Sequence, residues 1–139
     1  DSAAPGATAL LAAASPTNVG DAFTALPGSH FDVVLDRTHW LTGGTDVARL
    51  TALVSDGPVL KLSKEGTNVA VFPTTGPFYR AGFTWPGNTE RLLRGSALLI
   101  EEPLGRGHVV LFAHEPTFRG WWRAWDGVVW NAILLGPAI

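Results

Sequence analysis

The sequence predicts one α/β (or α+β) domain, built on a mixed β-sheet of about five or six strands with flanking helices. The chain has 139 residues, which suits a single domain. Apolar residues make up 46% and charged residues 16%, enough to form a sizeable core. Short apolar runs bounded by Gly, Pro and Asp are followed by one final run with helical spacing.

The first 27 residues are expected to form a linker of small residues, and residues 28–139 are expected to form the ordered domain. Ala, Gly, Ser, Thr and Pro dominate the linker. Within it, short helices are expected over about Ala7–Ala14 and Val19–Leu26, the second with Asn18 as its N-cap.

Apolar and β-branched runs predict four strands in the first half of the domain. The Asp56-Gly57 pair predicts a hairpin turn between the second strand and the third. A Pro- and Gly-rich loop is expected over Pro73–Gly87, and a short helix from Asn88 or Thr89 to Leu93. The four strands are Phe31–Asp36, Leu50–Val54, Val59–Leu62 and Asn68–Phe72.

The final third predicts a hairpin followed by a helix. Ser96–Glu101 and His108–Ala113 are expected to pair antiparallel across a Gly-containing turn. Arg119–Leu135 is expected to be helical, because apolar residues recur there at helical spacing. Gly136-Pro137 supplies the stop signal.

Composition excludes several function classes. A net charge of −2 argues against a nucleic-acid-binding protein. No apolar run is long enough to span a membrane. The chain has no Cys, which excludes disulfides, thiolate metal sites and a cysteine nucleophile.

Four residues are candidate ligand-binding residues: His39, His114, Glu115 and Arg119. His114 and Glu115 follow a predicted strand, where open α/β sheets place ligand-binding groups. The alternative is a turn in which Glu115 favours a helix start. Arg119 lies one helical turn from Arg123, so the pair clamps an anion, forms surface ion pairs or stacks on Trp122 or Trp40. No metal site is expected, because neither HExxH nor HxxE occurs.

Four tryptophans are expected on the final helix, and one helical stripe cannot hold them all. The leading interpretation is an interface with a partner domain. A platform for sugars or peptides and packing within the core are the alternatives. The four residues are Trp121, Trp122, Trp125 and Trp130.

Three stretches of the chain, within residues 27–138, resemble one family. Leu35–Gly43 reads LDRTHWLTG, and Gly66–Phe72 reads GTNVAVF, followed by Gly82–Trp85. Gly105–Trp122 reads GRGHVVLFAHEPTFRGWW, followed by Asn131–Pro137. Together they resemble the C-terminal region of large bacterial zinc carboxypeptidases of the carboxypeptidase A type. That region is similar to a class I glutamine amidotransferase-like domain.

The resemblance implies a degenerate amidotransferase-like, flavodoxin-like domain whose early parallel strands are missing or lie upstream. Active amidotransferases use a Cys nucleophile with a His-Pro-Glu motif. This chain has no Cys and reads His114-Glu115-Pro116, so no catalytic residue is expected here. The peptidase's zinc ligands belong to an upstream domain, so no cofactor is expected in this chain.

The resemblance therefore implies a non-catalytic accessory domain of a secreted or periplasmic zinc metallocarboxypeptidase, an enzyme that releases C-terminal residues from peptides. The expected partner is the upstream peptidase domain or another chain of the same protein, as in a homo-oligomer. The alternative function is a stand-alone peptide- or carbohydrate-binding module that uses exposed Trp side chains.

Overall fold

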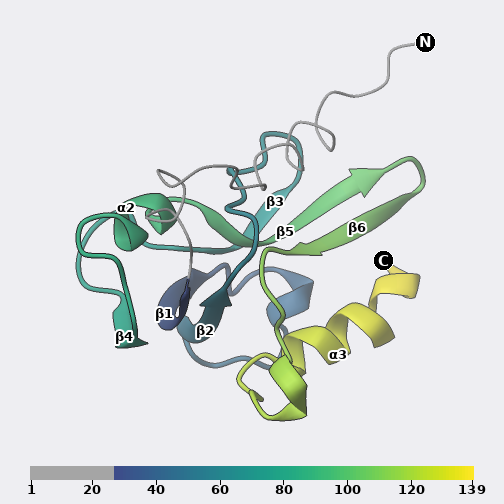
Figure 1. Cartoon of the computed structure of the whole chain (residues 1–139). Helices are drawn as coiled ribbons and strands as arrows, with labels where there is room; N and C mark the ends of the chain where they lie inside the picture. Colours follow the sequence, from purple (N-terminus) through teal and green to yellow (C-terminus); the bar gives the residue numbers. More distant parts are fainter. Residues whose placement is uncertain (1–26) are drawn as a thin grey trace.

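The computed structural model describes residues 27–139, which form a curled six-stranded sheet (Figure 1). The hydrogen-bonded order is β2-β1-β3-β5-β6, and β4 pairs with β1 off this path. Every strand pairing in the described part is antiparallel. The strands are β1 (Pro27–Leu35), β2 (Arg49–Ser55), β3 (Thr67–Val71), β4 (Tyr79–Gly82), β5 (Ala97–Leu104) and β6 (Gly107–Phe112).

Strand β1 branches the sheet. It pairs with β2 along one edge, with Phe31 opposite Ala52. Its other edge is shared, because residues 29–31 pair with β4 whereas Val34 and Leu35 pair with β3. Between these two partners, the N–H of Asp32 donates to the carbonyl of Phe78 at 2.7 Å. The backbone of β1 is thus bonded on both sides along most of its length.

Within residues 27–139, two α-helices lie at opposite ends of the described fold (Figure 1). They are α2 (Thr89–Leu93) and α3 (Asp126–Leu134). The same residues also form three 3₁₀ turns: η2 (Trp40–Thr42), η3 (Phe118–Gly120) and η4 (Gly136–Ala138). None of the helices in residues 27–139 has the length and apolar character that crossing a bilayer requires.

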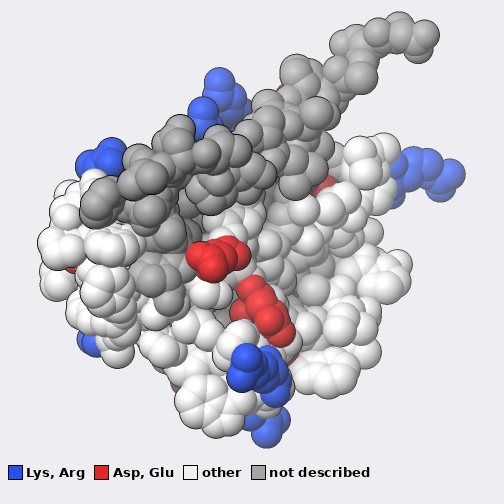
Figure 2. Space-filling model, in the orientation of Figure 1, with Lys and Arg blue, Asp and Glu red and all other residues white. Residues whose placement is uncertain are grey.

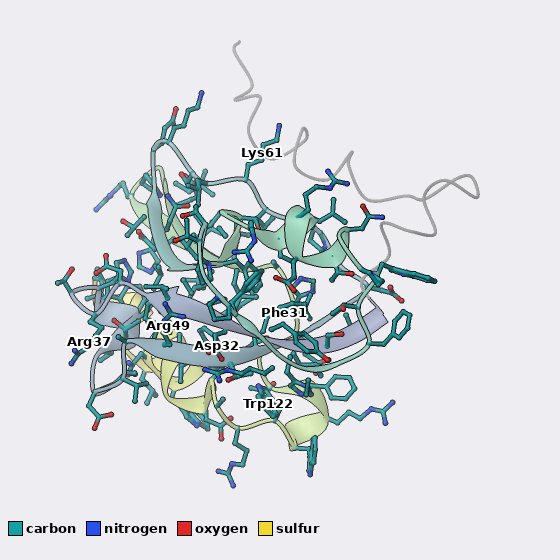
Figure 3. The ribbon with its side chains drawn as sticks, turned by 90° about the vertical axis from the view of Figure 1, so that its left-hand side faces the viewer. Phe31, Asp32, Arg37, Arg49, Lys61 and Trp122 are labelled. Carbon is teal, nitrogen blue, oxygen red and sulfur yellow. The ribbon has the colours of Figure 1, made fainter. Side chains whose placement is uncertain are left out.

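One hydrophobic core joins residues from β1, β2, β3, β5, α2, α3 and η2. Its centre includes three aromatic rings, with Phe31 and Phe78 at 5.2 Å and Phe72 and Phe78 at 6.1 Å between centroids. On the face shown in Figure 2, Lys and Arg side chains lie mostly toward the rim, whereas acidic side chains lie nearer the middle. In Figure 3, Phe31 lies within the fold, whereas Lys61 lies at its edge.

One charged side chain is buried beside this core. Asp32 on β1 is 3% exposed. Its carboxylate accepts hydrogen bonds from the Thr51 hydroxyl at 2.9 Å and from the Arg80 guanidinium, whose Nε lies at 2.7 Å. These hydrogen bonds, that of Arg80 above all, hold the pKa of Asp32 below its usual value. Asp32 thereby ties β1 to β2 and β4.

Much of the predicted architecture is confirmed. The sheet has six strands, and the C-terminal hairpin, the second and fourth predicted strands and the short helix α2 all form. The first strand was predicted to begin at Phe31, whereas β1 begins at Pro27. The predicted helices over Ala7–Ala14 and Val19–Leu26 lie outside the described residues.

The predicted hairpin at Asp56-Gly57 is wrong. Strand β2 pairs with β1, and Val59–Leu62 is not a strand. Only Leu60 in that segment forms a bridge, to Ala97 at the start of β5. The predicted loop over Pro73–Gly87 also contains a strand, β4, whose four residues are all exposed.

The predicted helix Arg119–Leu135 is too long, because α3 begins only at Asp126. Arg119 has a φ of 54° and Gly120 a φ of 64°. Two successive left-handed residues cannot continue a right-handed helix. The segment before α3 therefore forms η3 and irregular turns.

Candidate functional site: the cleft at His114

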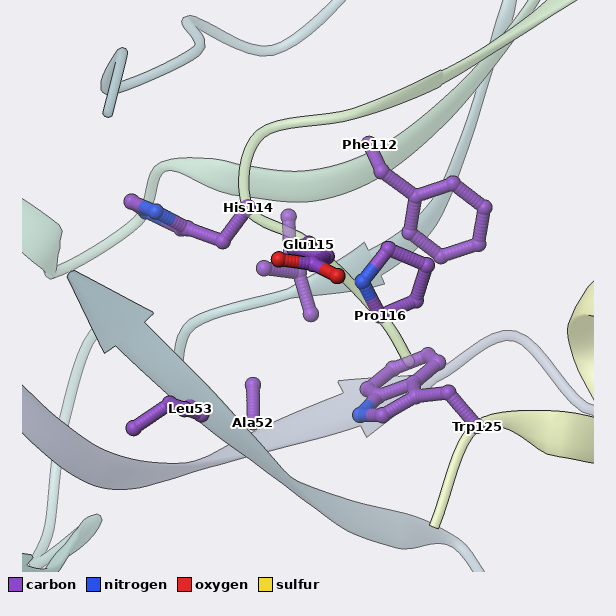
Figure 4. A pocket seen from close by; sticks show the side chains of 8 residues that line it. Ala52, Leu53, Phe112, His114, Glu115, Pro116 and Trp125 are labelled. Atoms are coloured by element: carbon purple, nitrogen blue, oxygen red, sulfur yellow. The ribbon is translucent and has the colours of Figure 1, made fainter. Parts of the chain in front are cut away.

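A cleft of about 370 Å³ lies where β2 and β6 end. The Ser55–Pro58 turn lines one side, and Phe112–Pro116 lines the other. Beside it lies a cavity of about 10 Å³, with Ala52, Leu53 and Trp125 in its wall (Figure 4). His114, Glu115 and Pro116 line both spaces.

The backbone after β6 positions His114. The N–H of Ala113 donates to the carbonyl of Leu98 at 2.8 Å, which holds the chain against β5 just past the end of β6. The imidazole ring then packs on Gly57 in the turn after β2. A Cβ on Gly57 would lie 2.8 Å from Nδ1 of His114 and 3.0 Å from the Ala113 carbonyl oxygen. Only a residue without a side chain fits this contact.

The hydrogen bond of His114 fixes its tautomer. Nδ1 lies 2.8 Å from the Ser55 carbonyl oxygen, which can only accept, so Nδ1 carries the proton. In the neutral ring, Nε2 is then an acceptor. Nε2 is buried and has no hydrogen-bond partner within residues 27–139, and the residue is 8% exposed. A buried polar atom left unpaired costs about 1–3 kcal/mol.

Burial also keeps the ring neutral. Removal from water lowers the pKa of His114, an effect that the Ser55 hydrogen bond partly opposes. The neutral imidazole, with Nε2 unprotonated, is therefore the dominant form of His114 at neutral pH. Around it the cleft lining includes two acidic residues, Asp56 and Glu115, and no Lys or Arg. Acidic side chains gather over the end of β2 and the segment after β6 in Figure 2.

The structure places His39 in a different cluster. Its Nε2 lies 3.8 Å from a carboxylate oxygen of Glu101, and Nδ1 of His108 lies 4.0 Å from the other. The Trp40 ring neighbours both imidazoles, with centroid distances of 5.6 Å to His39 and 5.3 Å to His108. These separations are longer than hydrogen bonds. The sequence analysis missed Glu101 and His108.

A signal for this cluster does exist in the sequence. In the hairpin register Glu101 lies opposite Val110, so His108 is its diagonal neighbour two residues along β6. Correct pairing of the predicted hairpin would have brought these two side chains to one face. Among residues 27–139, no three His, Asp or Glu side chains are grouped closely enough to hold a metal ion.

Of the four candidate ligand-binding residues, the cleft brings together only His114 and Glu115. Arg119 instead lies over the Phe118 ring, with its guanidinium carbon 5.0 Å from the centroid. His39 uses Nδ1 to accept the N–H of Leu41 at 3.3 Å. Neither residue lines the cleft.

The four tryptophans have different environments. Trp125 is 1% exposed, belongs to the core, and donates from Nε1 to the Thr51 carbonyl at 3.0 Å. Trp122 is half-buried against His30, with 4.8 Å between ring centroids. Trp121 is 76% exposed and Trp130 is 57% exposed. Only Trp130 lies within α3, so the prediction that all four share the last helix is wrong.

A second surface feature lies at the end of the chain. Large apolar side chains are exposed along α3 and past its end, and we call them the α3 apolar face. No charged residue occurs from Gly127 to Ile139. The face comprises Trp130, Ile133, Leu134, Leu135 and Ile139.

Residues 27–139 thus form an antiparallel α+β domain that carries the cleft at His114 and the α3 apolar face. Comparison of the chain with protein families, with curated proteins and with solved structures found no match.

Proposed function

We propose that this chain is a non-catalytic accessory domain that packs against a partner through the α3 apolar face. The single observation that carries the proposal is that face itself. Contiguous exposed apolar side chains on a soluble domain mark interaction surfaces. The amidotransferase-like ancestry of the domain belongs to the same proposal and rests on the motif resemblance.

The packing of α3 fixes which side faces outward. Asn131 donates from its side-chain amide to the carbonyls of Leu41 at 2.9 Å and Gly43 at 2.8 Å. Val128, one turn earlier, is buried in the core. These contacts set the rotation of the helix about its axis. Trp130 and Ile133, three residues apart, consequently lie together on the outer side.

The proposed occupant of this face is the catalytic domain of a secreted or periplasmic zinc carboxypeptidase. The support is the resemblance of the chain to the C-terminal region of such enzymes. The parent activity would be release of C-terminal residues from peptides. Zinc would belong to the peptidase domain, and the role of this chain would be to stabilise that domain or to shape access to it.

Titration calorimetry of the 139-residue chain with the expected peptidase domain tests the proposal. We expect saturable binding that the Trp130→Ser and Ile133→Ser substitutions each weaken roughly tenfold, because they remove central apolar contacts. Leu104→Ser is the matched control, since Leu104 is an exposed apolar residue on the β5–β6 hairpin. It should leave affinity unchanged.

Two outcomes contradict the proposal. One is the absence of binding, together with unaltered peptidase activity when the domain is deleted. The other is equal weakening by the α3 and Leu104 substitutions. Light scattering can instead show that the chain dimerises and that Trp130→Ser abolishes the dimer. In that case the α3 apolar face binds a second copy of this chain rather than the peptidase domain.

A second candidate function is a stand-alone module that binds peptides or carbohydrates. The observation that favours it is Trp121, whose large indole is 76% exposed beside η3. Titration of tryptophan fluorescence with glycans and peptides should then give a saturable shift. The shift should disappear in Trp121→Ala, and its persistence in that variant would count against a Trp121 platform.

A further inference from the structure

We infer that the cleft at His114 binds a cationic hydrogen-bond donor on an alkyl stem, namely an ammonium or guanidinium group such as the end of a Lys or Arg side chain. The inference is independent of the proposed packing of α3, because the cleft lies at the ends of β2 and β6 and shares no residue with the α3 apolar face.

The first argument is the acceptor that the fold leaves unused. Nδ1 of His114 is committed to the Ser55 carbonyl, and the same bond makes Nε2 an acceptor. Nε2 has no partner among the described residues. A ligand that donates a hydrogen bond satisfies this atom, whereas an ionised carboxylate brings only acceptors. The cleft therefore selects donors over anions.

The second argument is charge. Asp56 and Glu115 line the cleft, both are exposed, and neither forms an ion pair with any described residue. No Lys or Arg lines the cleft to neutralise them. Two carboxylates that line the same cleft as a neutral imidazole favour a positively charged group over a neutral donor.

The third argument is the apolar part of the wall. Pro58, Phe112 and Pro116 line the cleft together with these polar groups. Apolar side chains of this kind pack against methylene groups and leave a charged end to reach polar partners. A bare ion such as ammonium or sodium lacks the methylene stem. The combination fits an alkyl cation.

Access to Nε2 requires a small displacement, since the atom is shielded from water in the free protein. Asp56, Gly57 and Glu115 line the cleft and are exposed, so these residues are the ones free to shift when a ligand enters. Protonation of Nε2 would convert the acceptor into a donor and add a positive charge beside Asp56 and Glu115. Binding should accordingly weaken as the pH is lowered through the pKa of His114.

The test is a titration of the full chain, labelled with ¹⁵N-histidine, followed by the imidazole ¹⁵N resonances. The probes are agmatine, a guanidinium on an alkyl chain, and Nα-acetyl-lysine methylamide. The matched control probe is the same lysine derivative acetylated at Nζ, which keeps the stem and loses the charge. We expect saturable shifts at Nε2 of His114 with the two cations and no saturable shift with the acetylated control.

Two substitutions separate the parts of the site. In His114→Asn the side-chain amide can still donate to the Ser55 carbonyl while Nε2 is lost, so affinity for agmatine should fall at least about tenfold. Glu115→Gln removes one exposed carboxylate and should weaken binding about threefold and reduce its salt dependence. Glu90→Gln on α2, whose carboxylate pairs with Arg94, is the control and should change nothing.

The inference is overturned if neither cation shifts His114 at millimolar concentration, or if the acetylated control binds as tightly as the free amine. Full affinity in folded His114→Asn also overturns it. If that variant does not fold, Glu115→Gln decides the matter, because its side chain is exposed. Unchanged affinity and salt dependence in Glu115→Gln would then refute the electrostatic argument.

Discussion

Replacement of Trp125 by Phe should destabilise the fold, whereas the same replacement at Trp121 should not. The two tryptophans lie four residues apart in the sequence, yet Trp125 is 1% exposed and Trp121 is 76% exposed. Trp125 also packs edge-on against Phe112, with 6.2 Å between ring centroids. The sequence alone treats the two residues alike, so this pair of variants tests the packing directly.

The magnitude follows from two losses at Trp125. Phe cannot donate to the Thr51 carbonyl, and a lost hydrogen bond of this kind costs about 1 kcal/mol. Phe also fills less of the core, which adds about 1–2 kcal/mol. The free energy of unfolding should thus fall by about 2–3 kcal/mol in Trp125→Phe. Trp125→Ala should cost about 3–5 kcal/mol, and Trp121→Phe less than about 0.5 kcal/mol.

Urea denaturation followed by far-ultraviolet circular dichroism measures these differences without relying on tryptophan emission. With a slope of about 1–3 kcal/mol per molar urea, Trp125→Phe should lower the midpoint by about 1 M or more. Equal midpoints for Trp125→Phe and the unsubstituted chain would refute the buried, hydrogen-bonded position of Trp125. A large loss in Trp121→Phe would show that Trp121 is packed within the domain.

Three further outcomes are expected. Arg80 holds the pKa of Asp32 in the folded state below 3.8, the ordinary value of this carboxyl. The charged carboxylate therefore stabilises the fold above that pH. This stabilisation is lost as the pH falls through the lowered pKa of the folded state. Acid unfolding between about pH 5 and pH 2 should therefore be shallower in Asp32→Asn. Gly127→Ala should raise the free energy of unfolding by about 0.5–1 kcal/mol in thermal or urea melts, because a Cβ there meets no atom within 4 Å in α3. Gly57→Ala should cost about 1–3 kcal/mol and shift the Nδ1 resonance of His114, since the added Cβ collides with that ring.

Local signals predicted most of the sheet. The apolar runs at Leu50–Val54 and Asn68–Phe72 became strands β2 and β3, and the turn residues between Glu101 and His108 correctly predicted the hairpin. These elements carry their own pattern, so no knowledge of their neighbours was needed. Strand β4 has no such pattern, because all four of its residues are exposed and it is held by pairing with β1. Its existence depends on contacts distant in sequence.

The end of the chain shows a different limit. Apolar spacing extends back to Trp122, but the left-handed backbone at Arg119 and Gly120 prevents a right-handed α-helix from beginning at Arg119. Arg is a good helix former, and propensity gives no warning of a positive φ at that residue. The prediction consequently lengthened α3 by seven residues at its start, from Asp126 back to Arg119.

At the site, the sequence placed His114 and Glu115 just past a strand, which the structure confirms. Their role as ligand-binding residues stays a prediction. The partner of His114 could not have been predicted, because Ser55 ends β2 just before a turn that the sequence analysis assigned to a hairpin. This hydrogen bond joins a side chain to a backbone group 59 residues away, so the local sequence around neither residue indicates it.

The branching of the sheet at β1 has a consequence for how the molecule opens. Strands β4, β1 and β2 form one ribbon, and β3, β5 and β6 form another, with the register between them confined to Val34 and Leu35. Within residues 27–139 and apart from the shared core, backbone bonds join the ribbons only at this short seam, which also includes the bond from the Asp36 N–H to the Val69 carbonyl, so they can separate there without breaking the pairings inside either one. Native-state hydrogen exchange should then resolve two cooperative units, with the amides of the seam exchanging together at the lower free energy.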